Sequence, residues 1–507
     1  MYLLTLFFLK DSFATSVVVN NSIAEQSAFE DIEITRLAFG SCYEPTVENY
    51  IVSKGRQTSI WDGIRDFSPQ VFLWLGDNFY TDIVIDEAGN PKEKYMPANT
   101  LFLRETSFSN LKNNEISKAF ELSMYKSGYQ RILQQSNYKT FLESNPSIRI
   151  AALWDDHDFC VNDCFGKGDP FLTGRITEEA KLESRYHFLE FLNHSNLNTS
   201  FSDYVRTQKH WSDQNQGIYS TYLFGKDKRK IRVILLDSRY HQDPIKGDLL
   251  GEEQWLWLEN ILMQKDDAAF TIIASSIQYF PDLHGGPVRQ KIGEKFGETW
   301  GRSVKANFEV QDNQLVKEPY QTDFTQDRTR LIQLIAQSKR KGVVLISGDK
   351  HMGTIDSLSP QKQRSSISKE SNVSIGYPLF DITSSGLSHS LSTTLHKGTH
   401  VVGANWLYNT DLTTQRHLGT IEIDWSNETN PLLTISLRSE KNEIARTKDW
   451  RETPSKMEYS FIEHMALIGL QIRYVFRPAK PLSVQLSLED LSPKKPTERR
   501  FSALLHK

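Results

Sequence analysis

The chain has 507 residues, of which 38% are hydrophobic and 24% are charged, as in an ordinary globular protein. Its formal net charge is −4, and no basic block points to a nucleic-acid partner. No run of about 18 apolar residues occurs, so the sequence predicts no membrane-spanning helix.

The first part of the chain, residues 1–30, is predicted to be a signal peptide or a flexible N-terminus. An apolar run, Tyr2–Leu9, precedes a Ser-Phe-Ala sequence ending at Ala14, which resembles a cleavage site. A positively charged start is missing, and a first strand is the alternative interpretation. With a signal peptide, the mature protein would be periplasmic or secreted.

Short apolar runs in the first three-quarters of the chain each end in a cluster of polar residues. In chain order they are ITRLAF before GSC, QVFLWL before GDNFY, IRIAALW before DDHD, IRVILL before DSR, TIIAS before SIQ, GVVLI before SGDKH and LFDIT before SSGLSH. The runs are apolar almost throughout, which is typical of strands buried on both faces.

Segments with a helical pattern separate several of these runs. They are Ser59–Phe67, Ile116–Gln135, Glu178–Leu192, Gly251–Leu262 and Arg328–Arg340. Strands alternating with helices predict a layered α/β domain. In such sheets the ligand crevice lies beyond the carboxyl ends of the strands, so the polar clusters are expected to meet in one site.

Two long segments, Asp82–Asn114 and Gly285–Asp323, are interpreted as insertions that would act as lids or specificity walls. Between residues 418 and 438, GTIEIDW and LLTISLR are predicted to form an antiparallel pair. We therefore expect one domain over residues 31–446, followed by a C-terminal extension, residues 447–507, without an assigned role.

The cluster GDNFY offers three oxygen ligands at a predicted strand end. The carboxylate of Asp77 is suited to bridging two ions, Asn78 offers a neutral oxygen, and Tyr80 offers a phenolate, which favours a trivalent ion such as ferric iron. Gly-Asp-Asn is also ordinary turn chemistry, so this motif alone is a weak signal.

The stretch WDDHD places three carboxylates and His157 in four consecutive positions. Ionised carboxylates this close repel one another, and burying them is costly unless cations neutralise them. A solvated turn is the alternative, but Trp154 and the apolar run before it argue against full exposure. In SGDKH, Asp349 and His351 are one residue apart, so both can reach the same region, one to each of two ions.

The chain has three cysteines. A lone buried cysteine is usually a small hydrophobic residue. Cys42, however, occupies the strand-end position that a carboxylate takes in other clusters, so we expect a metal-bound thiolate there. Cys160 and Cys164 lie close together; in an exported protein we expect a disulfide between them, and in a reducing compartment two free thiols.

Taken in order, GSC, GD-x-x-Y, WDDHD, LD-x-R and SGD-x-H resemble the motifs of the PhoD-like alkaline phosphatases and phosphodiesterases, a branch of the calcineurin-like metallophosphoesterases. The resemblance runs from about Ile34 to Arg438, and YPLFDITSSGLSH resembles the family's late motif. It implies an α/β fold, a four-layer α/β/β/α sandwich with two central, mostly mixed sheets. It also implies a binuclear or trinuclear centre of Fe³⁺ and Ca²⁺, with Zn²⁺ or Mn²⁺ as alternatives.

The resemblance places metal ligands at seven positions of this chain: Cys42, Asp77, Asn78, Tyr80, Asp156, Asp349 and His351. The thiolate and the phenolate would hold iron together with Asp77, which would bridge the ions. Calcium prefers oxygen ligands, which fits Asn78, Asp156 and Asp349 alike. His157 takes the place of the superfamily's catalytic histidine.

These assignments imply hydrolysis of a small phosphate ester by a metal-activated hydroxide that attacks phosphorus in line. His157 would stabilise the leaving oxygen or the developing charge. Arg239 would grip a phosphate oxygen, with a structural ion pair as the equal alternative. Gln278 and His284 are weaker candidates, and Trp300 is interpreted as a pocket wall or, more simply, a core residue.

The sequence thus predicts an enzyme, a secreted or periplasmic metal-dependent phosphoric ester hydrolase. Two alternatives stay open: a phospholipase-type or cell-wall phosphodiesterase on the same fold, and a non-catalytic phosphate-binding relative. Ligand-type residues at every expected position argue against the non-catalytic alternative.

Overall fold

The structure is a computed structural model. It describes residues 27–55, 57–80, 83–85, 91–93, 125–160, 164–168, 176–196, 217–243, 246–279, 325–361, 363, 373–390, 412–446 and 480–493. Outside these residues lie most of the predicted signal peptide, much of the predicted insertion Asp82–Asn114, all of the predicted insertion Gly285–Asp323, His284 and Trp300.

The larger of the two main sheets has eight strands. In spatial order they are β1 (Ser27–Glu30), β7 (Ser220–Phe224), β8 (Ile231–Leu236), β9 (Phe270–Ser275), β10 (Val343–Ser347), β12 (Leu379–Ser384), β11 (Gly353–Leu358) and β13 (Leu412–Thr413). Strands β8, β9, β10 and β12 run parallel, whereas β7 and β11 are antiparallel to their neighbours in this central part. Every residue of β8, β9 and β10 is buried, which confirms strands covered on both faces.

The second sheet has six strands. In spatial order they are β16 (Ser483–Ser487), β15 (Leu432–Arg438), β14 (Leu418–Asp424), β2 (Arg36–Gly40), β3 (Val71–Leu75) and β6 (Arg149–Leu153). The three N-terminal strands run parallel to one another, and β14 and β15 form the predicted antiparallel pair. The edge strand β16 comes from the C-terminal extension, so part of that extension completes the sheet.

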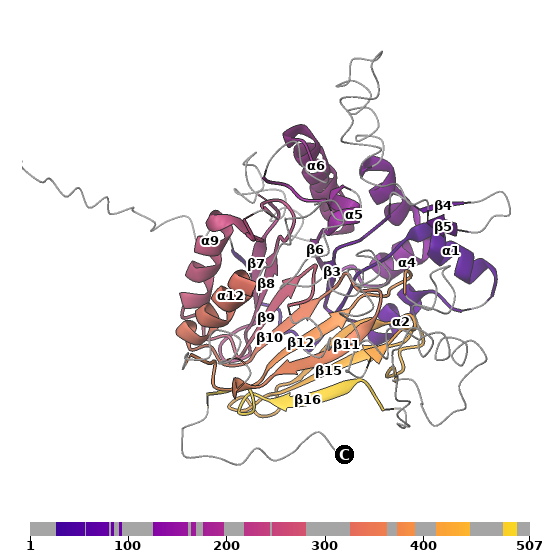
Figure 1. The fold of residues 1–507 in the computed structure, drawn as a ribbon. Helices are drawn as coiled ribbons and strands as arrows, with labels where there is room; N and C mark the ends of the chain where they lie inside the picture. The colour runs from indigo at the N-terminus through magenta and orange to yellow at the C-terminus, as the bar shows by residue number, and fades with distance from the viewer. Residues whose placement is uncertain are drawn as a thin grey trace, which may run out of the picture.

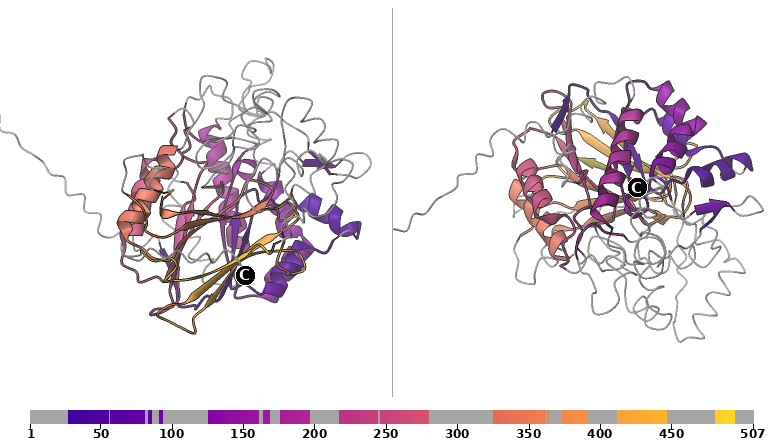
Figure 2. Two further views of the ribbon diagram at one scale, coloured as in Figure 1. Left: turned by 60° about the horizontal axis from the view of Figure 1, so that its bottom comes forward. Right: turned by 90° about the horizontal axis from the view of Figure 1, so that it is seen from above.

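Helices cover the outer sides of the two sheets (Figures 1 and 2). The named helices are α1 (Pro45–Ser53), α2 (Ile60–Phe67), α4 (Ser136–Ser144), α6 (Glu178–Ser195), α9 (Gly251–Met263) and α12 (Thr325–Ser338), and a single-turn helix, α5 (Asp156–Phe159), follows β6 at the strand ends. Helices α9 and α12 pack together beside the larger sheet, and α2 and α4 pack together beside the smaller one. This arrangement confirms the expected α/β/β/α layers. A separate short pair, β4 (Ile83–Ile85) and β5 (Pro91–Glu93), lies within the first predicted insertion.

Helix α2 shows how local sequence produces one of these layers. The side chain of Ser59 accepts a hydrogen bond from the backbone N–H of Trp61 and so caps the helix. Ile60, Ile64 and Phe67 recur at helical spacing and are all buried, so one face of the helix packs on the sheet.

The two sheets share one hydrophobic core, in which β12 contacts β14 and β6 contacts β8. An isolated parallel bridge between Ser41 and Ser385 joins the loop after β2 to the loop after β12. The strand-end loops of both sheets therefore meet at one edge of the core. Among the described residues, no helix has the length and apolar character needed to cross a membrane.

Candidate metal centre

Four strands deliver the predicted ligands to this edge. Cys42 follows β2, Asp77 follows β3, Asp156 follows β6 and Asp349 follows β10. The backbone is unusual there: among the described residues, nine that are not glycine have positive φ, and four of these nine are predicted ligands. The four have φ values between 49° and 73°: Cys42, Asp77, Asp349 and His351. Such conformations cost about 1–3 kcal/mol each and cluster at functional sites.

A first set of donors, the mixed-donor group, consists of Cys42, Asp77, Tyr80 and His351. The thiol of Cys42 donates to Asp77 Oδ2 at 3.5 Å, and the phenol of Tyr80 donates to the same oxygen at 3.0 Å. The phenol oxygen is also 2.9 Å from His351 Nε2. Ligand atoms of the cysteine, the aspartate and the histidine all lie within 4.8 Å of one another. Sulfur, nitrogen and oxygen donors thus converge on one point.

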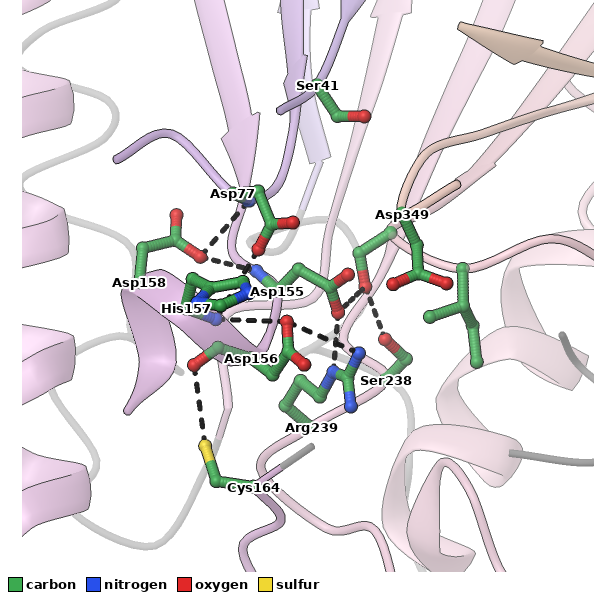
Figure 3. A network of polar contacts seen from close by, with 12 residues as sticks. Ser41, Asp77, Asp155, Asp156, His157, Asp158, Cys164, Ser238, Arg239 and Asp349 are labelled. Atoms are coloured by element: carbon green, nitrogen blue, oxygen red, sulfur yellow. Dashed lines mark hydrogen bonds and ion pairs between the residues drawn. The ribbon is translucent and has the colours of Figure 1, made fainter. Parts of the chain in front are cut away.

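A second set, the carboxylate group, consists of Asp155, Asp156 and Asp349. One oxygen from each lies within 4.8 Å of the others. Asp77, Asp156 and His157 form a third set, whose ligand atoms also lie within 4.8 Å of one another. It shares Asp77 with the mixed-donor group and Asp156 with the carboxylate group. Figure 3 shows these side chains around one space, with Asp77 and Asp349 reaching in from different sheets. The position of Asp77 in two sets is compatible with the bridging role expected for it.

Asn78 lies beside this space and is held by Asp158. Its side-chain nitrogen donates to Asp158 Oδ2 at 2.6 Å and to the Leu153 carbonyl at 2.9 Å. Asp158 also accepts hydrogen bonds from the backbone N–H groups of Asp77, Asn78 and Asp155. Asp158 therefore ties the loop after β3 to the loop after β6. The side-chain oxygen of Asn78 is buried and accepts no hydrogen bond from the described residues.

Arg239 forms the structural ion pair that the sequence left as one of two alternatives. Its Nε donates to Asp155 Oδ1 at 2.5 Å, and its Nη2 lies 3.7 Å from Asp156 Oδ1. The hydroxyl of Ser276 donates to the same Asp155 oxygen at 2.9 Å. Arg239 Nη1 is buried and makes no hydrogen bond within the described part of the chain.

The protein environment disfavours ionised carboxylates at this site. Burial raises the pKa of Asp77, and nearby carboxylates add to the rise, while His157 opposes it. Burial also raises the pKa of Asp155 against the opposing charge of Arg239, and burial raises the pKa of Asp158 to about 8. A bound cation would lower the pKa of these carboxyl groups again, because its charge stabilises the ionised form.

The donor set therefore fits a pair of metal ions. Burial, with a contribution from Asp77, raises the pKa of the Cys42 thiol, and a metal would supply the charge that stabilises the thiolate. One oxygen of Asp155, Oδ2, is buried and accepts no hydrogen bond from the described residues. An unsatisfied carboxylate oxygen beside two further carboxylates is what a cation site requires.

Two residues of the site were not singled out from the sequence. Asp155 stands beside Asp156 in WDDHD, and nothing in the sequence says which of them faces the site. His389 ends the late motif; its ring centroid is 4.3 Å from that of His351 and 4.6 Å from that of Tyr80. The sequence signal that would have identified it is its place in SSGLSH, the polar cluster that follows the apolar run LFDIT.

Gln278, Cys160 and Cys164 belong to neither donor group. Gln278 donates to Thr383 Oγ1 at 2.6 Å, within the polar network of the larger sheet. Cys160 and Cys164 are both buried free thiols, so the disulfide expected for an exported protein is not formed in this structure. Cys164 instead donates to the backbone carbonyl of Asp156 at 3.4 Å.

Comparisons with known proteins identify a protein family and several distantly related solved structures. A family model described as PhoD-like phosphatase matches residues 37–430. A solved structure described as "Structure of PhoD" has 13% sequence identity to this chain, with a TM-score of 0.47; the match covers 86% of this chain and 77% of that one. No curated protein matches.

Proposed function

The chain belongs to the PhoD-like phosphatase family, and from this premise we propose that it hydrolyses small phosphate esters at a metal centre formed by the mixed-donor group and the carboxylate group. The observation that supports the proposal is the convergence of ligand-type side chains from the loops after β2, β3, β6 and β10. Membership of the family supports phosphoester hydrolysis, whereas the metals and the substrate are part of the proposal.

The two groups differ in the metals they suit. The mixed-donor group has a thiolate, a phenolate, an imidazole and a carboxylate, and we assign it Fe³⁺. The carboxylate group offers oxygen alone, which suits Ca²⁺. Zn²⁺ or Mn²⁺ in place of either ion is the alternative. Bound cations would polarise the phosphoryl group and lower the pKa of a water molecule at neutral to alkaline pH.

The chain's own residues would then orient the ester and handle its charge. Arg239 Nη1, which has no partner within the described part of the chain, would donate to a phosphoryl oxygen. The ring of His157 lies 4.2 Å from that of Tyr80, at the edge of the mixed-donor group. From there His157 would carry the proton for the leaving oxygen. We also propose export to the periplasm or the medium, on the strength of the apolar run Tyr2–Leu9.

Metal analysis combined with two model substrates tests this function. The purified full-length protein should contain metal and should release p-nitrophenol from a mono- or a diester at alkaline pH, and a chelator should abolish the release. Asp77→Asn should lose metal and activity, because the bridging charge is gone; asparagine tolerates the positive φ of 49° at this position. Asp66→Ala, at a side chain that is 59% exposed, is the control.

If Asp77→Asn keeps both its metal content and its rate, the proposed centre is wrong. A wild-type protein without metal from a metal-replete host would instead favour the non-catalytic phosphate-binding alternative. Activity confined to phospholipid or cell-wall diesters would identify the more specialised enzyme on the same fold.

A further inference from the structure

Ser385 connects two loops that carry ligands of the mixed-donor group. It follows β12 directly, and its side chain is fully buried. Its hydroxyl oxygen lies 2.9 Å from Cys42 Sγ and accepts a hydrogen bond from the backbone N–H of His351 at 2.6 Å. One hydroxyl thus contacts the loop after β2 and the loop after β10.

The direction of these hydrogen bonds follows from the number of protons. A backbone N–H can only donate, so the Ser385 oxygen is the acceptor toward His351. Toward Cys42 Sγ either atom could donate while the thiol keeps its proton, but a thiolate can only accept, so the Ser385 hydroxyl would then be the donor. The thiol proton of Cys42 is directed elsewhere, to Asp77 Oδ2 at 3.5 Å. If a bound cation displaced that thiol proton to solvent, the hydrogen bond from the Ser385 hydroxyl to the sulfur would remain possible.

The backbone N–H of Ser385 has two hydrogen-bond acceptors. Its N–H is shared between the Met352 carbonyl and His417 Nε2, each at 3.2 Å. Burial lowers the pKa of His417 to about 4, so its ring is neutral. Because Nδ1 of His417 donates to the Gln415 carbonyl at 2.7 Å, Nε2 is free to accept from Ser385. These contacts anchor the backbone that carries the Ser385 hydroxyl.

We propose that Ser385 is a positioning residue of the metal centre, whose hydroxyl donates to the Cys42 thiolate and holds the backbone of His351 so that sulfur and imidazole face the same ion. This inference rests on the proposed function. Hydrogen bonds to a coordinated sulfur withdraw charge from it and orient it, so they tune both affinity and electronic structure. Ser41, whose hydroxyl lies at a longer 3.5 Å from the same sulfur, is the weaker contact.

Cobalt binding by the chelator-treated, full-length protein tests the proposal without reference to activity. In Ser385→Ala the dissociation constant for Co²⁺ should rise about 10- to 100-fold. The thiolate-to-cobalt absorption band should also move to longer wavelength, because the sulfur lone pairs are no longer stabilised by the hydroxyl. Ser384→Ala is the matched control: that serine is equally buried, and its hydroxyl donates to the Phe39 carbonyl at 3.5 Å.

Ser385→Thr keeps the hydroxyl, and its absorption band should stay at the wild-type position. The proposal is wrong if Ser385→Ala binds Co²⁺ within about threefold of wild type and the band does not move. It is also wrong if the threonine variant, or Ser384→Ala, shifts the band as far as Ser385→Ala does. Absence of a thiolate-to-cobalt band in the wild-type protein would instead refute the metal centre itself, which separates the two failures.

Discussion

Replacement of Arg239 by methionine should destabilise the metal-free protein strongly. The side chains of Arg239 and Asp155 are each 1% exposed, and their ion pair is the closest charged contact in the carboxylate group. Without the guanidinium, Asp155 keeps only the hydroxyl of Ser276 among the partners of its Oδ1. Removing one partner of a buried pair costs about 3–5 kcal/mol, because the other charge is left uncompensated.

Arg229 provides a matched control within the same chain. It also pairs with two carboxylates, those of Glu33 and Glu428, each at 2.9 Å, but its side chain is 38% exposed. Water and salt screen such pairs, so Arg229→Met should change the stability little. The two variants remove the same chemical group and differ in the burial of the partners left behind.

Urea unfolding followed by tryptophan fluorescence, in the presence of a chelator, measures the difference. The Arg239→Met midpoint should fall well below those of the wild type and of Arg229→Met. Added metal should narrow the gap, because a cation can neutralise Asp155 in place of the guanidinium. Equal midpoints for the two variants would refute the reasoning. Arg239 would then have no role in stabilising the fold, and only its proposed contact with the phosphate ester would remain.

Three further expectations concern other parts of the chain. Cys42→Ser should lose metal and thiolate-to-metal absorption, whereas Cys160→Ser should retain both, as metal analysis and visible spectra would report. Burial raises the pKa of Asp158 from its usual 3.8 to about 8, so the folded, metal-free protein holds a proton that the unfolded chain releases; its melting temperature should fall as pH rises from 4 toward 8. A flat profile in thermal scans would contradict this. Leu491→Ala should lower the free energy of unfolding by about 2–5 kcal/mol, because this side chain of the extension is fully buried. Leu256→Ala, at a side chain that is 51% exposed, should cost far less in the same urea titration.

Much of the fold was predictable because the strands are buried on both faces. An apolar run such as QVFLWL has no polar side to present to solvent, and it forms β3 within one residue of the expected bounds. Helices with one apolar face were equally clear, as in α2. The edge strand β16 could not be recognised, because only one of its five residues is buried and the rest carry no strong pattern.

The candidate site was predictable as a set of strand ends and not as a geometry. Each cluster contains side chains that can bind a metal, which the sequence shows directly. Which clusters lie close together depends on the order of the strands in the two sheets, which the sequence does not show. Asp155 and Asp156 are neighbours in the sequence, and only the ion pair with Arg239 distinguishes their surroundings. Ser385 and His389 belong to a loop that reaches Cys42 across more than 340 positions, a contact that no local pattern encodes.

The place of β2 in the smaller sheet also has a consequence for synthesis of the chain. This strand lies between β3, which follows soon after it, and β14, which begins only at Leu418. At 5–20 residues per second, a ribosome would add β14 about 20–75 s after β2. One edge of β2 stays open on the nascent chain for all of that time, with the thiol of Cys42 at its end. Folding of this protein therefore favours a chaperone that shields the N-terminal strands until the last fifth of the chain emerges, and metal loading only after that point.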